Sequence, residues 1–132
     1  MNMHTRRNIF IACAMSLVAA SALPLTAHAQ GVRKGPNGGM VGGSNGHEVE
    51  LVISGAEASV YVLDDGKVVA VGKAQLRMVV QSGGKTTNPS LTLAEPNRLA
   101  AKFPEPLPKG SIVVITGRDD HGHSLTARFT IS

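Results

Sequence analysis

From His47 to the end of the chain, short runs rich in Val, Ile, Leu and Thr are interrupted at regular intervals by turn-forming residues. Such spacing is typical of an antiparallel β-sandwich or barrel, because each run suits a strand and no window has the 3.6-residue repeat of a helix. The sequence therefore predicts an all-β chain. The turn signals are GAE at 55–57, DDG at 64–66, SGGK at 82–85, EPN at 95–97, PEPLPKG at 104–110 and RDDHG at 118–122.

Alternation within these runs predicts half-buried strands, because successive side chains of a strand point to opposite faces. Leu125, Ala127 and Phe129, for example, alternate with Thr126 and Arg128. We expect a single small antiparallel β-sandwich, immunoglobulin-like, of about seven to eight strands. The predicted strands lie near 47–53, 58–63, 67–71, 75–81, 90–94, 98–103, 111–117 and 123–131.

The N-terminal segment has the pattern of a secretory signal peptide. Arg6 and Arg7 precede a short apolar run, and a small-x-small site ends at Ala29. Cleavage there leaves a chain that starts at Gln30, contains no cysteine, and has no stop-transfer segment that would retain it in a membrane. We therefore expect 1–29 to be a signal peptide, 30–46 a glycine-rich flexible lead-in, and 47–132 the sandwich domain of a periplasmic protein.

Composition argues against two function classes. Without Arg6 and Arg7 the chain has only a slight excess of basic residues, and its single tyrosine and lack of tryptophan leave little to stack on bases. Nucleic-acid binding is therefore not expected. No serine lies in a nucleophile-elbow pattern and the glycine-rich segment does not match a P-loop, so we do not expect an enzyme.

The turn RDDHGHS contains the residues best suited to hold a metal ion. His121 and His123 are two apart, so in an extended strand they project to the same face at about 6.5–7 Å, within reach of one ion. Asp119 and Asp120 add oxygen ligands, and we include Asp120 in the predicted site. The alternative is an ordinary polar turn between two strands, because Asp, His and Gly are common turn residues.

Two further residues are candidates for the same site. His47 opens a predicted strand, and whether it reaches His121 and His123 depends on the number of strands between them. If all eight predicted strands are present, the first and the eighth start at opposite ends of the sandwich, and His47 lies far from His121 and His123. If 67–71 is not a separate strand, the count is seven, and the three histidines can converge. Met40 carries a thioether that suits Cu(I), or it is incidental in the lead-in.

Several segments together resemble a group of small exported bacterial proteins whose module is similar to an N-terminal domain of heavy-metal efflux adaptor proteins. The resemblance implies a periplasmic β-sandwich connected with metal efflux or metal homeostasis. Its opening element begins here with Pro36 and Asn37, where the group can have a histidine. The segments are GPNGGMV, HEVELVI, VYVLDDGKVV, NRLAAKF and LPKGSIVVITGRDDHGHSLTARFTI; the recurring motif positions are Pro36–Gly39, His47, Glu50, Leu51, Tyr61, Asp64, Gly66 and Lys67.

The leading hypothesis is a non-enzymatic periplasmic accessory protein that weakly binds a transition-metal ion, copper or zinc. Its expected ligands are His121 and His123 with Asp120 and with His47 or Met40, and its expected partner is a heavy-metal efflux adaptor or another envelope protein. The alternative is a metal-independent module that binds an envelope protein through an exposed sheet edge or the loop 104–110.

Overall fold

The computed structural model of the chain describes residues 33–132. Among these residues all regular elements are strands, so the described part contains no helix that could cross a membrane. The predicted signal peptide, its cleavage site and the first residues of the lead-in lie outside this range. The strands are β1 (Arg33–Lys34), β2 (Met40–Ser44), β3 (His47–Ser54), β4 (Glu57–Asp64), β5 (Lys67–Val69), β6 (Gln75–Ser82), β7 (Lys85–Thr87), β8 (Thr92–Glu95), β9 (Arg98–Lys102), β10 (Ile112–Arg118) and β11 (Ser124–Thr130).

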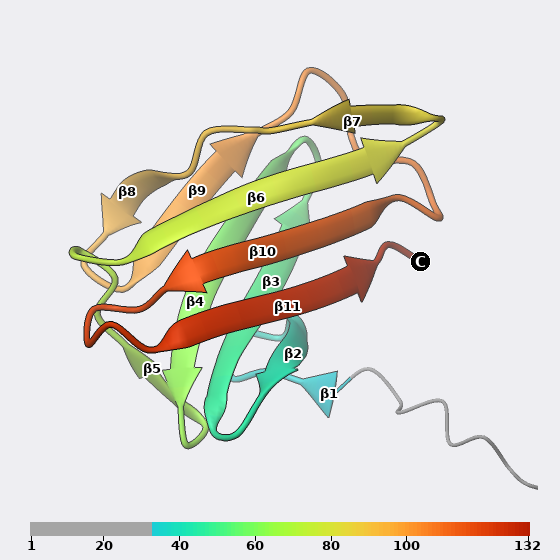
Figure 1. Cartoon of the computed structure of the whole chain (residues 1–132). Helices are drawn as coiled ribbons and strands as arrows, with labels where there is room; N and C mark the ends of the chain where they lie inside the picture. The colour runs from blue at the N-terminus through green and yellow to red at the C-terminus, as the bar shows by residue number, and fades with distance from the viewer. Residues whose placement is uncertain (1–32) are drawn as a thin grey trace, which may run out of the picture.

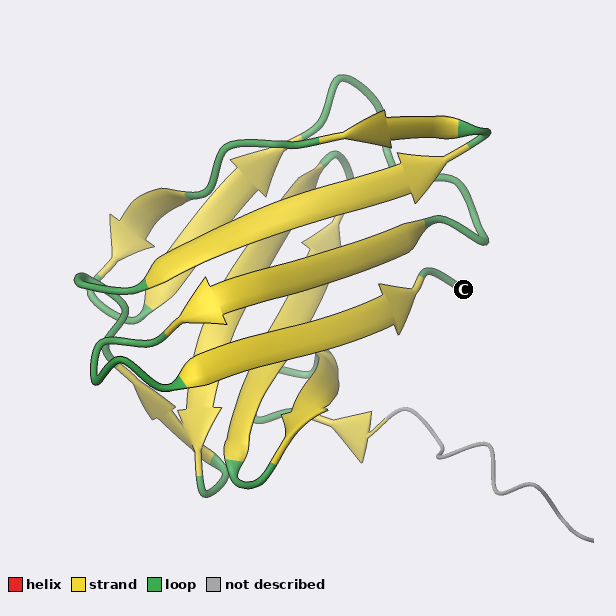
Figure 2. Cartoon of the chain, in the orientation of Figure 1, coloured by secondary structure: helices red, strands yellow, loops and turns green. Residues whose placement is uncertain are grey.

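The strands form two antiparallel sheets that lie face to face, and their directions cross (Figure 1). One sheet has the order β1-β2-β3-β4-β9-β8, with β5 also paired to β4, and the other has the order β11-β10-β6-β7. Figure 2 shows that turns and loops connect the strands throughout the described range. The prediction of an all-β chain built from antiparallel strands is confirmed.

The core lies between the two sheets and is made by alternate residues of their strands. In β11 the exposed and buried positions alternate without exception, and Leu125, Ala127 and Phe129 are buried. Val60 of β4 and Ile115 of β10 belong to the same apolar cluster, so each sheet contributes one inner face. The alternation read from the sequence therefore places these side chains correctly.

The glycine-rich segment differs from the flexible lead-in that the sequence predicts. Met40 to Ser44 form β2, which pairs in register with Leu51 to His47 of β3. Gly42 permits this strand to lie close to the second sheet, because a Cβ at this position would be about 3.2 Å from the ring of Phe129. The high entropy cost of ordering glycine is offset here by strand pairing and by this close approach.

The loop before β2 is held by the fully buried carboxylate of Glu50. Its Oε2 accepts hydrogen bonds from the backbone N–H groups of Asn37, at 2.9 Å, and Gly39, at 2.8 Å. Its Oε1 accepts a further bond from the side-chain amide of Asn37, at 2.9 Å. A buried carboxylate needs such donors to replace water, so Glu50 and this loop stabilise each other.

The short strand β5 determines that the start of β3 and the end of β10 lie at the same end of the molecule. It has three residues and pairs only with the last part of β4, next to the start of β3. The chain then enters β6, whose first residue, Gln75, pairs with the last residue of β10, Arg118. Because β5 does not cross the molecule, the start of β3 and the turn between β10 and β11 lie at the same end.

Candidate metal centre

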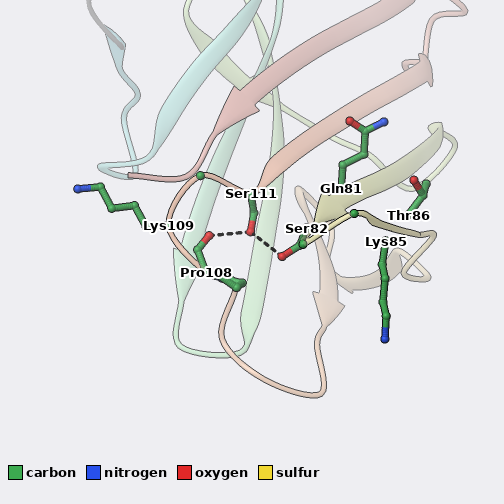
Figure 3. A pocket seen from close by; sticks show the side chains of 10 residues that line it. Gln81, Ser82, Lys85, Thr86, Pro108, Lys109 and Ser111 are labelled. Atoms are coloured by element: carbon green, nitrogen blue, oxygen red, sulfur yellow. Dashed lines mark hydrogen bonds between the residues drawn. The ribbon is translucent and has the colours of Figure 1, made fainter.

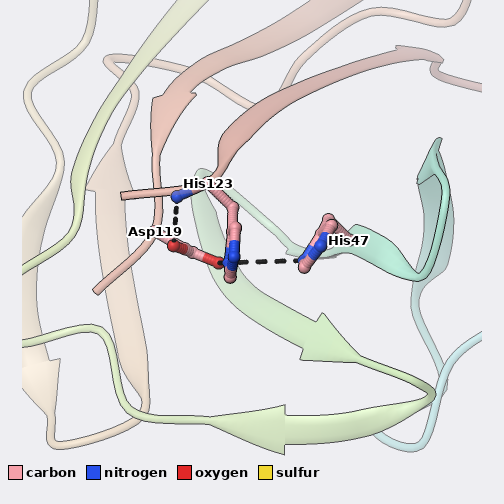
Figure 4. A group of neighbouring side chains, drawn as sticks. All are labelled: His47, Asp119 and His123. Atoms are coloured by element: carbon pink, nitrogen blue, oxygen red, sulfur yellow. Dashed lines mark hydrogen bonds and ion pairs between the residues drawn. The ribbon is translucent and has the colours of Figure 1, made fainter. Parts of the chain in front are cut away.

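His47 and His123 meet at this end of the two sheets (Figure 4). His47 is the first residue of β3, opposite Asp64 of β4, and His123 comes immediately before β11 in the other sheet. Their imidazole rings are stacked, with centroids 4.2 Å apart and an interplanar angle of 28°. The strand topology thus brings together two histidines that are distant in the sequence.

Asp119 lies beside the ring of His123 and is almost fully buried (Figure 4). Its Oδ1 accepts hydrogen bonds from the backbone N–H groups of His121, at 2.9 Å, and His123, at 2.8 Å. Its Oδ2 is 3.1 Å from Nδ1 of His123 and 3.9 Å from Nδ1 of His47. Only the first of these Oδ2 distances is short enough for a hydrogen bond.

The pKa of the Asp119 carboxyl lies below its ordinary value. Burial acts in the opposite direction and raises this pKa, because it disfavours the charged form. The hydrogen bonds from the backbone and side chain of His123 and from the backbone of His121, with the charge of His123, outweigh burial and lower it. Asp119 is therefore an ionised acceptor toward the imidazoles at neutral pH.

Two further hydrogen bonds and the conformation of Gly122 fix the backbone of the turn that carries His121 and His123. The guanidinium of Arg118 donates to the carbonyl oxygen of Gly122, at 2.9 Å. The carboxylate of Asp120 accepts from the backbone N–H of Lys73, at 2.9 Å, and so connects this turn to the loop between β5 and β6. Gly122 has a φ of +80°, a conformation that glycine adopts without strain.

The structure brings together only part of the predicted ligand set. His47 and His123 are adjacent, and the exposed ring of His121 lies 6.2 Å from that of His123, centroid to centroid. Asp120 is bonded to the neighbouring loop instead of facing the two stacked rings. Met40 pairs with Leu51 at the far end of β2 from His47 and packs against the core, which removes the thioether from the cluster.

The central carboxylate is Asp119, whereas the predicted ligand set includes its neighbour Asp120. The signal for it is local: an aspartate at the end of a strand commonly accepts hydrogen bonds from backbone N–H groups of the following turn. That pattern favours the first aspartate of the pair, whose side chain then turns inward. The second aspartate, Asp120, points to a different loop.

The three residues His47, Asp119 and His123 offer one nitrogen or oxygen atom each, and these atoms all lie within 4.8 Å of one another. Nδ1 of His47 is buried and has no hydrogen-bond partner within the described part of the chain. Imidazole nitrogen with carboxylate oxygen suits zinc or divalent copper better than hard or very soft ions. The cluster thus has the donor chemistry of a transition-metal site.

A cavity of about 560 Å³ lies at the opposite end of the second sheet, beside the turn between β6 and β7 (Figure 3). Ser111, which is buried, donates from its Oγ to the carbonyl oxygen of Pro108, at 2.6 Å, and lies 3.1 Å from Oγ of Ser82. Lys85 and Lys109 also line this cavity, and its lining has no histidine or carboxylate. It therefore lacks the imidazole and carboxylate groups that ordinarily bind metal ions in proteins.

Comparison of the chain with protein-family models, with curated proteins and with solved structures finds no match. The resemblance to efflux-adaptor modules therefore stays a hypothesis.

Proposed function

We propose that this protein binds a divalent transition-metal ion, zinc or copper, at the cluster of His47, Asp119 and His123. The observation that carries the proposal is the convergence within 4.8 Å of the imidazole of His47, from the start of β3, with the imidazole of His123 and the buried carboxylate of Asp119, both from the turn between β10 and β11. Within residues 33–132 the buried Nδ1 of His47 has no hydrogen-bond partner, and this supports the proposal because a buried polar atom ordinarily has one. Metal coordination would supply that partner.

We also propose that the scaffold is an immunoglobulin-like sandwich. The strand orders β3-β4-β9-β8 and β7-β6-β10-β11 correspond to the A-B-E-D and C′-C-F-G sheets of that fold. In this correspondence residues 65–74 form the B–C loop and residues 119–123 the F–G loop. These loops lie at the end that immunoglobulin variable domains use for recognition, and here they contact each other through Lys73 and Asp120.

The proposed physiological role is that of a non-enzymatic accessory in the periplasm that carries or senses the ion for an efflux system. The N-terminal pattern of a signal peptide and the resemblance to efflux-adaptor modules support this role. His123 is about half exposed and His47 about a quarter exposed, and a site open to solvent suits an ion that must be received and released.

The proposal is tested by titrating untagged protein with Zn²⁺ and Cu²⁺. The background is His4→Ala/His28→Ala, so that the chain retains only His47, His121 and His123. Native mass spectrometry is expected to give one ion per chain, and the ring signals of His47 and His123 are expected to shift together in NMR spectra. A dissociation constant above about 1 mM, which corresponds to a binding free energy of only about 4 kcal/mol, would contradict the proposed metal-binding function.

A second candidate function is supported by Leu93. It is a large apolar residue with 56% of its surface exposed, on β8 at the edge of the larger sheet. Ala70, Gly72 and Pro96 line a shallow depression beside it. This surface suits a metal-independent contact with an envelope protein. Crosslinking in cells should then be lost in Leu93→Lys and should be unaffected by a chelator.

A further inference from the structure

We infer that His121 supplies a third imidazole to the proposed metal site, while Asp119 positions His123 and does not itself bind the ion. This inference rests on the proposed metal-binding function and assigns the coordinating atoms. It defines a nitrogen-rich site for a divalent ion of intermediate softness, Zn²⁺ or Cu²⁺.

The hydrogen bonds of Asp119 leave it poorly placed to be a ligand. Both of its oxygens already accept bonds: Oδ1 from the backbone of His121 and His123, and Oδ2 from the ring of His123. Because an Asp119 carboxylate oxygen lies 3.1 Å from Nδ1 of His123, this ring nitrogen is the donor, which leaves Nε2 as the nitrogen that can bind a metal. A carboxylate that holds one ring nitrogen so that the other binds a metal is a common arrangement around metal sites.

If Asp119 is not a ligand, the cluster provides only two ligands, the nitrogen atoms of His47 and His123. A transition-metal site in a protein ordinarily has three or more protein ligands. A third imidazole close to this pair is that of His121, whose ring centroid is 6.2 Å from that of His123, with the ring planes tilted by 53°. Its side chain is exposed, so the ring is free to rotate, whereas Asp119 fixes its backbone N–H.

The ring separations are compatible with a small rearrangement. Two imidazoles bound to one tetrahedral ion at about 2.1 Å have centroids about 5.3 Å apart. The stacked pair of His47 and His123, at 4.2 Å, must therefore open by about 1 Å, and the pair of His121 and His123, at 6.2 Å, must close by a similar amount. Rotation about side-chain bonds at an open rim provides movements of this size.

The donor set also restricts the ion. In the part of the chain that the structure describes there is no cysteine, and Met40 lies against the core at the far end of β2. Without thiolate or thioether, the site has no preference for Cu⁺, whereas imidazole suits Zn²⁺ and Cu²⁺. We therefore expect Zn²⁺ and Cu²⁺ to bind more tightly than Cu⁺.

The test compares unsubstituted protein, His121→Ala and the control Lys85→Ala, whose exposed side chain lies at the opposite end of the second sheet. All three are untagged and carry His4→Ala/His28→Ala, so the unsubstituted protein of this comparison is the His4→Ala/His28→Ala chain. Pulsed electron paramagnetic resonance with one equivalent of Cu²⁺ counts coordinated imidazoles, and calorimetry with Zn²⁺ gives the affinity. We expect three imidazoles in the unsubstituted protein and the control, two in His121→Ala, and an affinity in that variant lower by at least about tenfold.

The variant Asp119→Asn tests separately whether Asp119 positions the ring of His123 without binding the ion. We expect it to retain three imidazoles and to bind Zn²⁺ about 10- to 100-fold more weakly, with a changed ring-nitrogen spectrum for His123. Two imidazoles in the unsubstituted protein, or unchanged affinity in His121→Ala, would overturn the inference and leave the proposed function standing. No binding of either ion by the unsubstituted protein would overturn both.

Discussion

The imidazole ring of His123 stacks on that of His47 at a centroid distance of 4.2 Å, and the two rings come from different sheets. The same carboxylate, Asp119, lies within 3.9 Å of a nitrogen of each ring. The cluster is therefore both a candidate ligand set and a contact between the sheets. Substitutions in it are expected to affect stability and metal binding separately, and each effect needs its own measurement.

Replacement of Asp119 by alanine is expected to destabilise the fold by about 1–3 kcal/mol. It leaves the backbone N–H groups of His121 and His123 without the partly buried acceptor that they share. Urea unfolding in the presence of a chelator measures the change. Asp120→Ala is the matched control: it removes a single, more exposed bond to Lys73, worth about 0.5–1.5 kcal/mol. If Asp120→Ala lowers the free energy of unfolding by as much as Asp119→Ala or more, the central role of Asp119 is contradicted.

The lowered pKa of Asp119 predicts how its contribution to stability depends on pH. Its folded-state pKa lies below the unfolded value of about 3.9, so the folded form favours the ionised carboxylate. This contribution is fully present above the unfolded pKa and is lost as the pH falls through the folded pKa. The unfolding free energies of the original protein and of Asp119→Asn should therefore converge as the pH falls from 5 toward 2. A difference that stays constant over this range would show that the charge of Asp119 is not stabilising.

Replacement of Glu50 by glutamine is expected to cost about 1.5–3 kcal/mol and to loosen residues 33–39. A glutamine has only one acceptor oxygen, so if that oxygen keeps the bonds from the backbone N–H groups of Asn37 and Gly39, its amide N–H₂ faces the side-chain amide of Asn37, a donor against a donor. Urea unfolding gives the free energy, and amide hydrogen exchange should show faster exchange at Gly39. Exchange unchanged at Gly39 would mean that the loop is held by β2 pairing alone. Glu57→Gln, at a partly exposed carboxylate of β4, is the control.

The strand pattern of this fold is largely readable from the sequence. All eight predicted strands have counterparts in the structure. In segments such as 75–81 and 123–131, apolar residues alternate with polar ones, so only one face of the strand can be buried. The sequence analysis missed β1, β2 and β7. In β2, glycines replace some of the apolar residues that normally signal a strand, and the role of Gly42 depends on Phe129, which is distant in the sequence. Local patterns contain no information on such contacts.

The candidate site was only partly predictable for a similar reason. His121 and His123 are close in any fold because they share a turn, but the position of His47 depends on whether 67–71 crosses the molecule. As the structure has it, β5 is a three-residue strand that does not cross. The choice between Asp119 and Asp120 depends on which side chain turns inward at the end of β10, and alternation stops being a guide where a strand ends.

The most direct test of the account is the response of the melting temperature to metal in the His47→Ala/His123→Ala double variant. Unsubstituted protein should melt at a higher temperature with Zn²⁺ than with a chelator, because an ion that binds only the folded chain stabilises it. The double variant should melt at the same temperature under both conditions, and Lys85→Ala should respond like the unsubstituted protein. An equal rise in the double variant, or no rise in the unsubstituted protein at millimolar Zn²⁺, would contradict the assignment of the metal site.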